Sequence, residues 1–253
     1  CNGGVERMIW FTILLTMIGV FLSAWILIPP PVFALVPLSV GAPEISPWLI
    51  ILNSVAAFLA WKIPKVSRFA LIASLFALGL SLLPLLQFPG AATLAETEFS
   101  QKIDSAPIPN ALRSQFRSSQ LNLIDVFRGI SIPKVRRDLN IEFARPDGVA
   151  LKMNVYRPVK TGKNPAIVAI YGGAWRSGDP SANQQFNEYI AAQGYTVLAI
   201  DYRHSPQYKF PAHLEDIETA LRFIQQHADE YEVDLNRIAM MGRSAGGHLA
   251  MLA

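Results

Sequence analysis

The sequence predicts an α/β domain with a mostly parallel sheet, preceded by a region of transmembrane helices. Long apolar runs with few charges fill residues 1–87. From Val135 onward, short apolar runs rich in β-branched residues alternate with segments that have helical periodicity. Strands that alternate with helices indicate a parallel sheet, and apolar runs of about 20 residues are long enough to cross a bilayer.

The composition supports this division. Of the 253 residues, 51% are hydrophobic and only 16% are charged, below the ~25% that is usual for soluble domains. The net charge of +3 is spread along the chain without a basic stripe, so we expect no nucleic-acid partner. Cys1 is the only cysteine, which excludes an intrachain disulfide and a cysteine zinc cluster. We predict no metal and no organic cofactor.

Three apolar runs are predicted to span the membrane, over residues 8–28, 47–61 and 69–86. Tryptophans near the ends of the first two runs fit an aromatic belt. The alternative is a single anchor followed by a hairpin that dips into the membrane. A cleaved signal peptide is less favoured, because no small-residue cleavage site follows the first run. The chain begins at Cys1 without Met, which we interpret as a truncated start rather than a lipid-modified cysteine.

The basic residues predict the orientation. Lys62, Lys65 and Arg68 lie between the second and third runs, whereas the loop from Pro29 to Ser46 has no Lys or Arg. The positive-inside rule places the basic loop in the cytoplasm. With three crossings, the domain after the membrane region is then extracytoplasmic.

Residues 88–134 form a connector or cap. A helix over 109–127 is expected there, for which simple packing is slightly preferred to a cap over the active site or a helix on the membrane surface.

The α/β domain is predicted over residues 135–253. Alternating residues predict a hairpin of two strands, Val135–Phe143 and Leu151–Arg157, joined by a turn of composition Arg-Pro-Asp-Gly. The later elements follow in order: a strand at 166–170, a helix near 182–193, a strand at 196–200, a helix near 211–227, a strand at 237–241 and a helix from 249.

The last strand leads into Gly242-Arg243-Ser244-Ala245-Gly246-Gly247-His248. A strand, then Gly-x-Ser-x-Gly, then a helix is the pattern of the nucleophile elbow in α/β-hydrolases. A serine hydroxyl is a weak nucleophile and must be presented to a base. The glycines on either side leave room for the sharp turn, and the new helix directs free N–H groups toward the reaction centre. By itself the motif is equally compatible with an ordinary loop before a helix.

The strand at 166–170 leads into Tyr171-Gly172-Gly173-Ala174-Trp175, which has the form of the oxyanion loop of lipases and esterases. Small residues let backbone N–H groups approach a developing oxyanion. The alternative is a plain glycine turn, but its position upstream of the elbow argues for a joint role.

Three segments, YGGAWRSGD, DYRHSPQYKFPAHLEDI and GRSAGGHLA, occur in this order. Together they resemble the hormone-sensitive-lipase-like esterases, and they are similar to the feruloyl-esterase-like and kynurenine-formamidase-like α/β-hydrolases. The resemblance covers about Val135 to Ala253. Tyr171 stands where these families usually have His, and Arg243 where they usually have Asp, which leaves substrate preference open more than reaction class.

The resemblance implies that Ser244 is the nucleophile. It assigns the oxyanion donors to the N–H groups of Gly173, Ala174 and Ala245, with Gly172 shaping the loop. The triad Asp and His would follow the serine in chain order, and we expect them not to be among the present residues.

The four histidines are poor substitutes for the triad base, and His248 lies one turn beyond the serine. The sequence therefore predicts an incomplete hydrolase with an open sheet edge beside the elbow strand. The 253-residue chain alone is expected to be inactive.

The predicted function is a membrane-anchored serine hydrolase of the carboxylesterase type, which cleaves a small or medium ester through an acyl-enzyme. Trp175 and Phe210 are candidates to line an acyl or alcohol pocket. One alternative is an acyltransferase with the same nucleophile, in which the product passes to an alcohol rather than to water. Another is a non-catalytic, hydrolase-like binding domain. The sequence predicts no oligomeric state.

Overall fold

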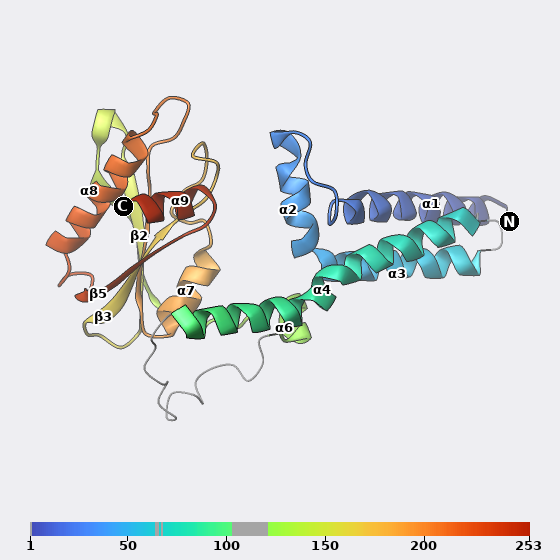
Figure 1. The fold of residues 1–253 in the computed structure, drawn as a ribbon, viewed down its shortest axis with the longest axis horizontal. Helices are drawn as coiled ribbons and strands as arrows, with labels where there is room; N and C mark the ends of the chain where they lie inside the picture. The colour runs from blue at the N-terminus through green and yellow to red at the C-terminus, as the bar shows by residue number, and fades with distance from the viewer. Residues whose placement is uncertain (1, 64–65, 67, 103–120) are drawn as a thin grey trace. The chain divides into compact units, whose positions relative to one another are not determined.

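The computed structural model describes residues 2–63, 66, 68–102 and 121–253 (Figure 1). The chain divides into two compact units, Cys1–Gly129 and Ile130–Ala253.

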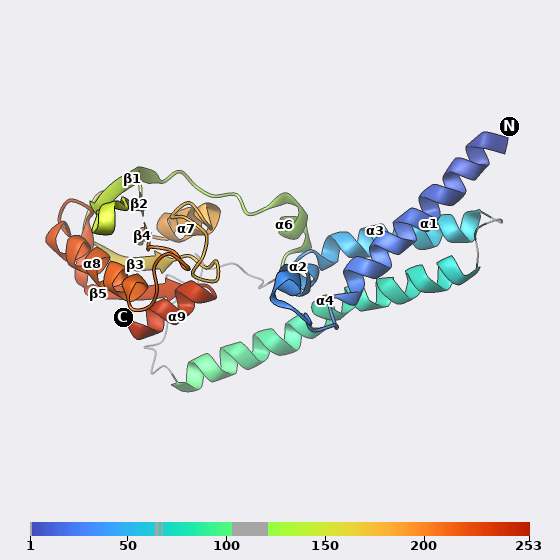
Figure 2. The ribbon, with the colours of Figure 1, turned by 90° about the horizontal axis from the view of Figure 1, so that it is seen from above.

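The first unit is helical. Helices α1, α3 and α4 pack against one another (Figure 2). The elements, in chain order, are α1 Asn2–Ala24, η1 Phe33–Leu35, α2 Val36–Glu44, α3 Ser46–Lys62, α4 Arg68–Lys102 and α6 Leu123–Arg128.

Two helical segments of this unit, Gly3–Ala24 and Arg68–Glu98, are long and apolar enough to cross a membrane. The pair Phe33–Glu44 and Ser46–Lys62 would supply a third crossing only if counted as one span, and it is bent by 79°. The first predicted span, 8–28, is helical only as far as Ala24. The run predicted at 69–86 continues without a break to Lys102, because the prolines inside it do not end the helix. Prolines are tolerated in long apolar helices.

The connector therefore begins as part of α4 and ends in the short helix α6. Most of the helix expected over 109–127 lies outside the described residues.

Buried polar side chains join the three long helices. The Asn53 amide of α3 donates to the hydroxyls of Ser23 in α1 and Ser81 in α4, both at 2.9 Å. The two serine hydroxyls are 3.0 Å apart. About two helical turns from Ser23 and Ser81, the hydroxyls of Thr16 in α1 and Ser74 in α4 form a further pair at 3.0 Å. Side-chain hydrogen bonds between helices of this kind are a normal means of association in apolar surroundings.

The second unit contains a sheet with helices on both faces. Its elements are β1 Arg136–Ala144, η2 Pro146–Gly148, β2 Leu151–Arg157, β3 Asn164–Ile170, α7 Gln184–Ala192, β4 Thr196–Ile200, α8 Ala212–Gln226, β5 Val233–Gly242 and α9 Ala245–Leu252.

The sheet is mixed, which corrects the prediction of a mostly parallel one. The strand order is β1-β2-β4-β3-β5. Strand β4 pairs in parallel with β3, and β3 with β5, but β2 is antiparallel to both of its neighbours. The short turn at Pro146–Gly148 reverses the chain after β1, because a tight hairpin joins only antiparallel strands. The three parallel strands are the ones that carry the candidate site.

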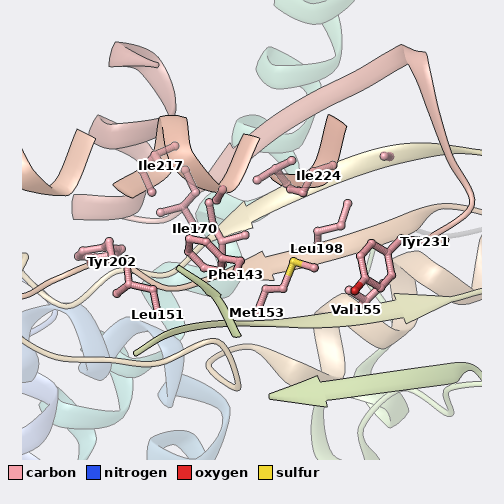
Figure 3. Packing of buried hydrophobic residues seen from close by; sticks show 14 of the residues in the cluster. Phe143, Leu151, Met153, Val155, Ile170, Leu198, Tyr202, Ile217, Ile224 and Tyr231 are labelled. Carbon is pink, nitrogen blue, oxygen red and sulfur yellow. The ribbon is translucent and has the colours of Figure 1, made fainter. Parts of the chain in front are cut away.

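The core explains why the central strands read as continuous apolar runs. Alternate side chains of a strand point to opposite faces of the sheet. Val168 and Leu198 belong to the larger core cluster, together with Ile217 of α8 and Leu249 of α9. Figure 3 shows Leu198 and Ile217 within this cluster. The intervening side chains, such as Val197, face a smaller cluster that is covered by α7. The central strands β3 and β4 are therefore covered on both faces, as parallel strands usually are.

Candidate active site

Ser244 occupies a sharp turn between β5 and α9. Its backbone angles are φ 52° and ψ −120°, which few residues other than glycine adopt. Its side chain is exposed. Holding a non-glycine residue in such a conformation costs about 1–3 kcal/mol, and backbone strain of this kind clusters at functional sites.

The two glycines of the motif are required by space. A Cβ atom on Gly242 would lie 2.1 Å from the carbonyl oxygen of Gly246, and one on Gly246 would lie 2.1 Å from that of Ile170. Neither position can hold a side chain unless the backbone moves. The two glycines of the elbow thus pack against each other, and Gly246 also packs against the end of β3.

The loop after β3 lies against this turn. A Cβ on Gly172 would be 2.6 Å from the Arg243 carbonyl oxygen and 3.2 Å from the Ser244 Cβ. Gly173 has φ 151°, and a side chain there would collide with the Ser177 carbonyl oxygen at 1.8 Å. The structure therefore brings Gly172, the first residue of the predicted 172–174 segment, next to Ser244.

The predicted oxyanion donors are not engaged elsewhere. Within the described part of the chain, the backbone N–H groups of Gly173, Ala174 and Ala245 donate no hydrogen bond. Ala174 has φ 54°, an uncommon value for alanine, and Ala245 is the first residue of α9. Three N–H groups on segments that meet at Ser244 are thus available to an acceptor.

The histidines are all occupied by other partners. Nε2 of His213 lies 3.2 Å from the Ser205 hydroxyl, and burial lowers the His213 pKa. His227 stacks on Phe223 at the end of α8. The ring of His248 lies edge-on to another aromatic ring, that of Trp175, at 5.4 Å. The backbone N–H of His248 donates to the Ser244 carbonyl oxygen at 3.1 Å, but in the residues that the structure describes no histidine ring forms a hydrogen bond with the Ser244 hydroxyl.

The carboxylates around Arg203 are also paired. Asp216 is 2% exposed and binds the Arg203 guanidinium at 2.8 Å. It also accepts the backbone N–H of Arg203 at 2.8 Å. Asp147 and Glu215 contact the same guanidinium, at 2.6 and 3.4 Å. This network fixes the segment after β4 to the start of α8.

In the sequence, Tyr171 stands out only as a departure from the families that the chain resembles. In the structure its hydroxyl lies between the carboxylate of Asp201, at 2.5 Å, and Nε2 of His204, at 2.8 Å. Burial raises the pKa of Tyr171 above its ordinary value and also raises that of Asp201. The proximity of Tyr171 and Asp201 could have been expected from the sequence, because each directly follows a strand and the two strands were expected to run in parallel.

An apolar cavity of about 530 Å³ lies beside α9. Trp175 and Phe210, the residues proposed to line an acyl or alcohol pocket, both border it. The other lining residues are Ser205, His213, His248, Leu249 and Leu252. Among the described residues, no group of three or more His, Cys, Asp or Glu side chains is arranged to hold a metal ion.

Comparison with known proteins gives concordant matches for this unit. Residues 153–253 match the BD-FAE family. The probable carboxylic ester hydrolase LipM of Mycobacterium tuberculosis is 40% identical over 94 residues, which cover 37% of this chain and 22% of LipM. Esterase LipC of the same organism is 38% identical over 110 residues, covering 42% of this chain and 27% of LipC. An arylesterase of Saccharolobus solfataricus is 32% identical over 114 residues, 45% of this chain and 36% of that protein.

Among solved structures, the thermophilic esterase Est2 of Thermogutta terrifontis matches with 35% identity and a TM-score of 0.41, over 46% of this chain and 42% of Est2. The matched region thus spans between about a fifth and two fifths of the length of these relatives. All four are named as esterases or as carboxylic ester hydrolases.

Proposed function

We propose that residues 130–253 carry the nucleophile and the oxyanion-binding groups of a serine esterase of the α/β-hydrolase type. The observation that carries the proposal is the backbone of Ser244, held at φ 52° on a turn whose glycines admit no side chain, beside three unengaged N–H groups. Similarity to named esterases over this same region supports it.

In the proposed reaction, the Ser244 oxygen attacks the carbonyl carbon of an ester. The carbonyl oxygen gains negative charge as its π bond breaks, and the N–H groups of Gly173, Ala174 and Ala245 donate to it. The C–O bond to the alcohol then breaks, leaving an acyl group on Ser244. Water attacks the acyl-enzyme, and the acid is released.

The serine proton must pass to a base, which returns it to the leaving alcohol. The four histidines of this chain are held by other groups. The proposal therefore requires a further histidine and its carboxylate partner, which the resemblance places after the serine in chain order.

A hydrolysis assay tests the proposal. The full-length gene product should hydrolyse p-nitrophenyl acetate, and Ser244→Ala should lower kcat by at least about 10³-fold while the protein remains folded. Ser181→Ala is the matched control, because Ser181 is an exposed serine of the same unit that is paired with Asp179. Turnover that survives in Ser244→Ala would reject the assignment. Adding an alcohol separates hydrolysis from acyl transfer, since a transferase would form the new ester instead of the free acid.

We also propose that the first unit anchors the protein in a membrane, with three crossings and the 130–253 unit outside the cytoplasm. The apolar lengths of α1 and α4 and the basic loop at 62–68 support this. If the bent pair of helices does not cross, two crossings place both ends of the region on one side.

Labelling of an engineered cysteine distinguishes these topologies. In intact cells that express a Cys1→Ser, Ser181→Cys variant, an impermeant maleimide should label the exposed position 181. Protection equal to that of a cytosolic control would contradict the proposed topology.

A further inference from the structure

Two neighbouring strand ends bring Tyr171 and Asp201 together. Strands β3 and β4 pair in parallel with Ile170 opposite Ile200, so the residues that follow them lie side by side. The Tyr171 hydroxyl donates to Oδ1 of Asp201 at 2.5 Å, and Nε2 of His204 lies 2.8 Å from the same hydroxyl. Because the hydroxyl has one proton and gives it to Asp201, His204 is the donor in the second bond.

A second set of contacts ties the loop to the same segment. The backbone N–H of Ser205 donates to the Trp175 carbonyl oxygen at 2.7 Å. The Tyr202 hydroxyl donates to the Tyr171 carbonyl oxygen at 3.2 Å. The rings of these two tyrosines stack, with centroids 4.6 Å apart. Both ends of the 171–175 loop are therefore fastened to the segment that follows β4.

The far side of the loop closes over the phenol ring. A Cβ on Gly178 would lie 2.4 Å from the ring of Tyr171, so only glycine allows the loop to pack there. The Tyr171 side chain is buried, at 4% exposure. Its hydroxyl is taken up by Asp201 and His204, so we expect any effect on the reaction to act through the loop backbone.

We infer that Tyr171 is a positioning residue: its hydroxyl, held by Asp201 and His204, fixes the backbone of the 172–174 segment beside Ser244. This inference rests on the proposed function for its kinetic consequence, but its structural consequence can be measured separately. Oxyanion donors contribute through their placement at the transition state, so a loosened loop lowers kcat more than it changes KM.

Tyr171→Phe tests the inference, because phenylalanine keeps the ring and its stacking but removes the hydroxyl. In the full-length gene product we expect kcat for p-nitrophenyl acetate to fall about 10- to 100-fold, with KM changed less than about twofold. Amide hydrogen exchange of the loop should become faster at Arg176, Ser177 and Ser205, whose N–H groups donate to the carbonyl oxygens of Gly173 and Trp175.

Tyr156→Phe is the matched control. Tyr156 is fully buried in the cluster covered by α7, and its hydroxyl makes no hydrogen bond among the described residues. We expect its kcat and its loop exchange to equal those of the wild type. A Tyr171→Phe variant with wild-type exchange and kcat would overturn the inference, as would an equal loss in Tyr156→Phe.

The two proposals fail in different ways. If hydrolysis does not depend on Ser244, the proposed function fails, while loop exchange still decides the positioning role. If Tyr171→Phe does not fold, His204→Ala removes one partner and leaves the other bond. It should lower kcat and speed loop exchange in the same direction, and wild-type values for both would refute the inference.

Discussion

A methyl group at position 246 has no space in the elbow. Gly246→Ala therefore measures how much the stability of the domain and the reactivity of Ser244 depend on the close packing at this position. The new Cβ would lie 2.1 Å from the Ile170 carbonyl oxygen and 2.5 Å from that of Tyr171. Restoring normal contact requires the start of α9 to move by about 1 Å away from β3. Forcing such a group into a packed site costs about 1–3 kcal/mol. The gain in helix propensity, at most about 1 kcal/mol, offsets part of this.

The neighbouring residue provides the control. A Cβ on Gly247 would lie 3.0 Å from the Gly242 carbonyl oxygen, a contact that a shift of a few tenths of an ångström relieves. Both substitutions add one methyl group to α9, so they differ mainly in the collision. We expect Gly246→Ala to lower the free energy of unfolding by about 1–2 kcal/mol and Gly247→Ala by less than about 0.5 kcal/mol.

The two variants should also differ at Ser244. A displacement of about 1 Å reduces reactivity by about 100-fold in well-positioned sites. Urea unfolding followed by circular dichroism gives the stability, and the rate of labelling by a fluorophosphonate gives the reactivity of the serine. If Gly246→Ala matched Gly247→Ala in both measurements, the elbow would not be packed as described.

Three further predictions concern other contacts. Arg203→Ala should lower the free energy of unfolding by about 3–5 kcal/mol in urea titrations, because it leaves the buried carboxylate of Asp216 without its partner. Asn53→Leu should lower the thermal stability of the detergent-solubilised protein by about 1–2 kcal/mol, because it removes the bonds that join three helices. The hydrogen bond from Arg136 lowers the pKa of Glu232 from its usual 4.5. The bond between Arg136 and the ionised Glu232 therefore contributes to stability above pH 4.5, and this contribution is lost as the pH falls through the lower pKa of the folded state. Glu232→Gln should flatten the acid side of the profile of unfolding free energy against pH.

Each of these has a matched control on an exposed side chain. Arg222→Ala removes an exposed cation of α8, Thr93→Ala removes an exposed hydroxyl of α4, and Glu142→Gln neutralises an exposed partner of Arg145. These variants should stay within about 0.5 kcal/mol of the wild type. Equal losses in a test variant and its control would contradict the role assigned to the buried contact.

The strands could be predicted closely because their signal is local. The predicted strands 151–157 and 196–200 coincide with β2 and β4. β-branched runs and turn residues set these limits within a few positions. The reversal of β2 could not be predicted in full, because its antiparallel pairing with β4 joins residues more than 40 positions apart. The length of α4 was missed because the prediction followed the apolar run at 69–86 and treated the more polar residues after it as a connector, whereas the helix continues through Pro84 and Pro89 to Lys102.

In the site, too, local features could be predicted from the sequence and long-range contacts could not. The glycines at 242 and 246 carry a steric requirement that the motif itself expresses, and the structure shows the collisions that it implies. The Tyr171 contacts depend on which strands are neighbours and on the path of the segment after β4. The order of the expected parallel strands points to Asp201 as a neighbour, but a pattern along the chain does not record the path of the later segment, so the contact with His204 emerges only in the folded domain.

The central claim is that Ser244 is an activated nucleophile, and mass spectrometry of a fluorophosphonate adduct tests it most directly. The full-length gene product should carry one phosphonyl group on the peptide that contains Ser244, and Ser244→Ala should carry none while retaining its circular dichroism spectrum. An unmodified Ser244 in the folded protein, or an adduct on another residue that persists in Ser244→Ala, would contradict the account.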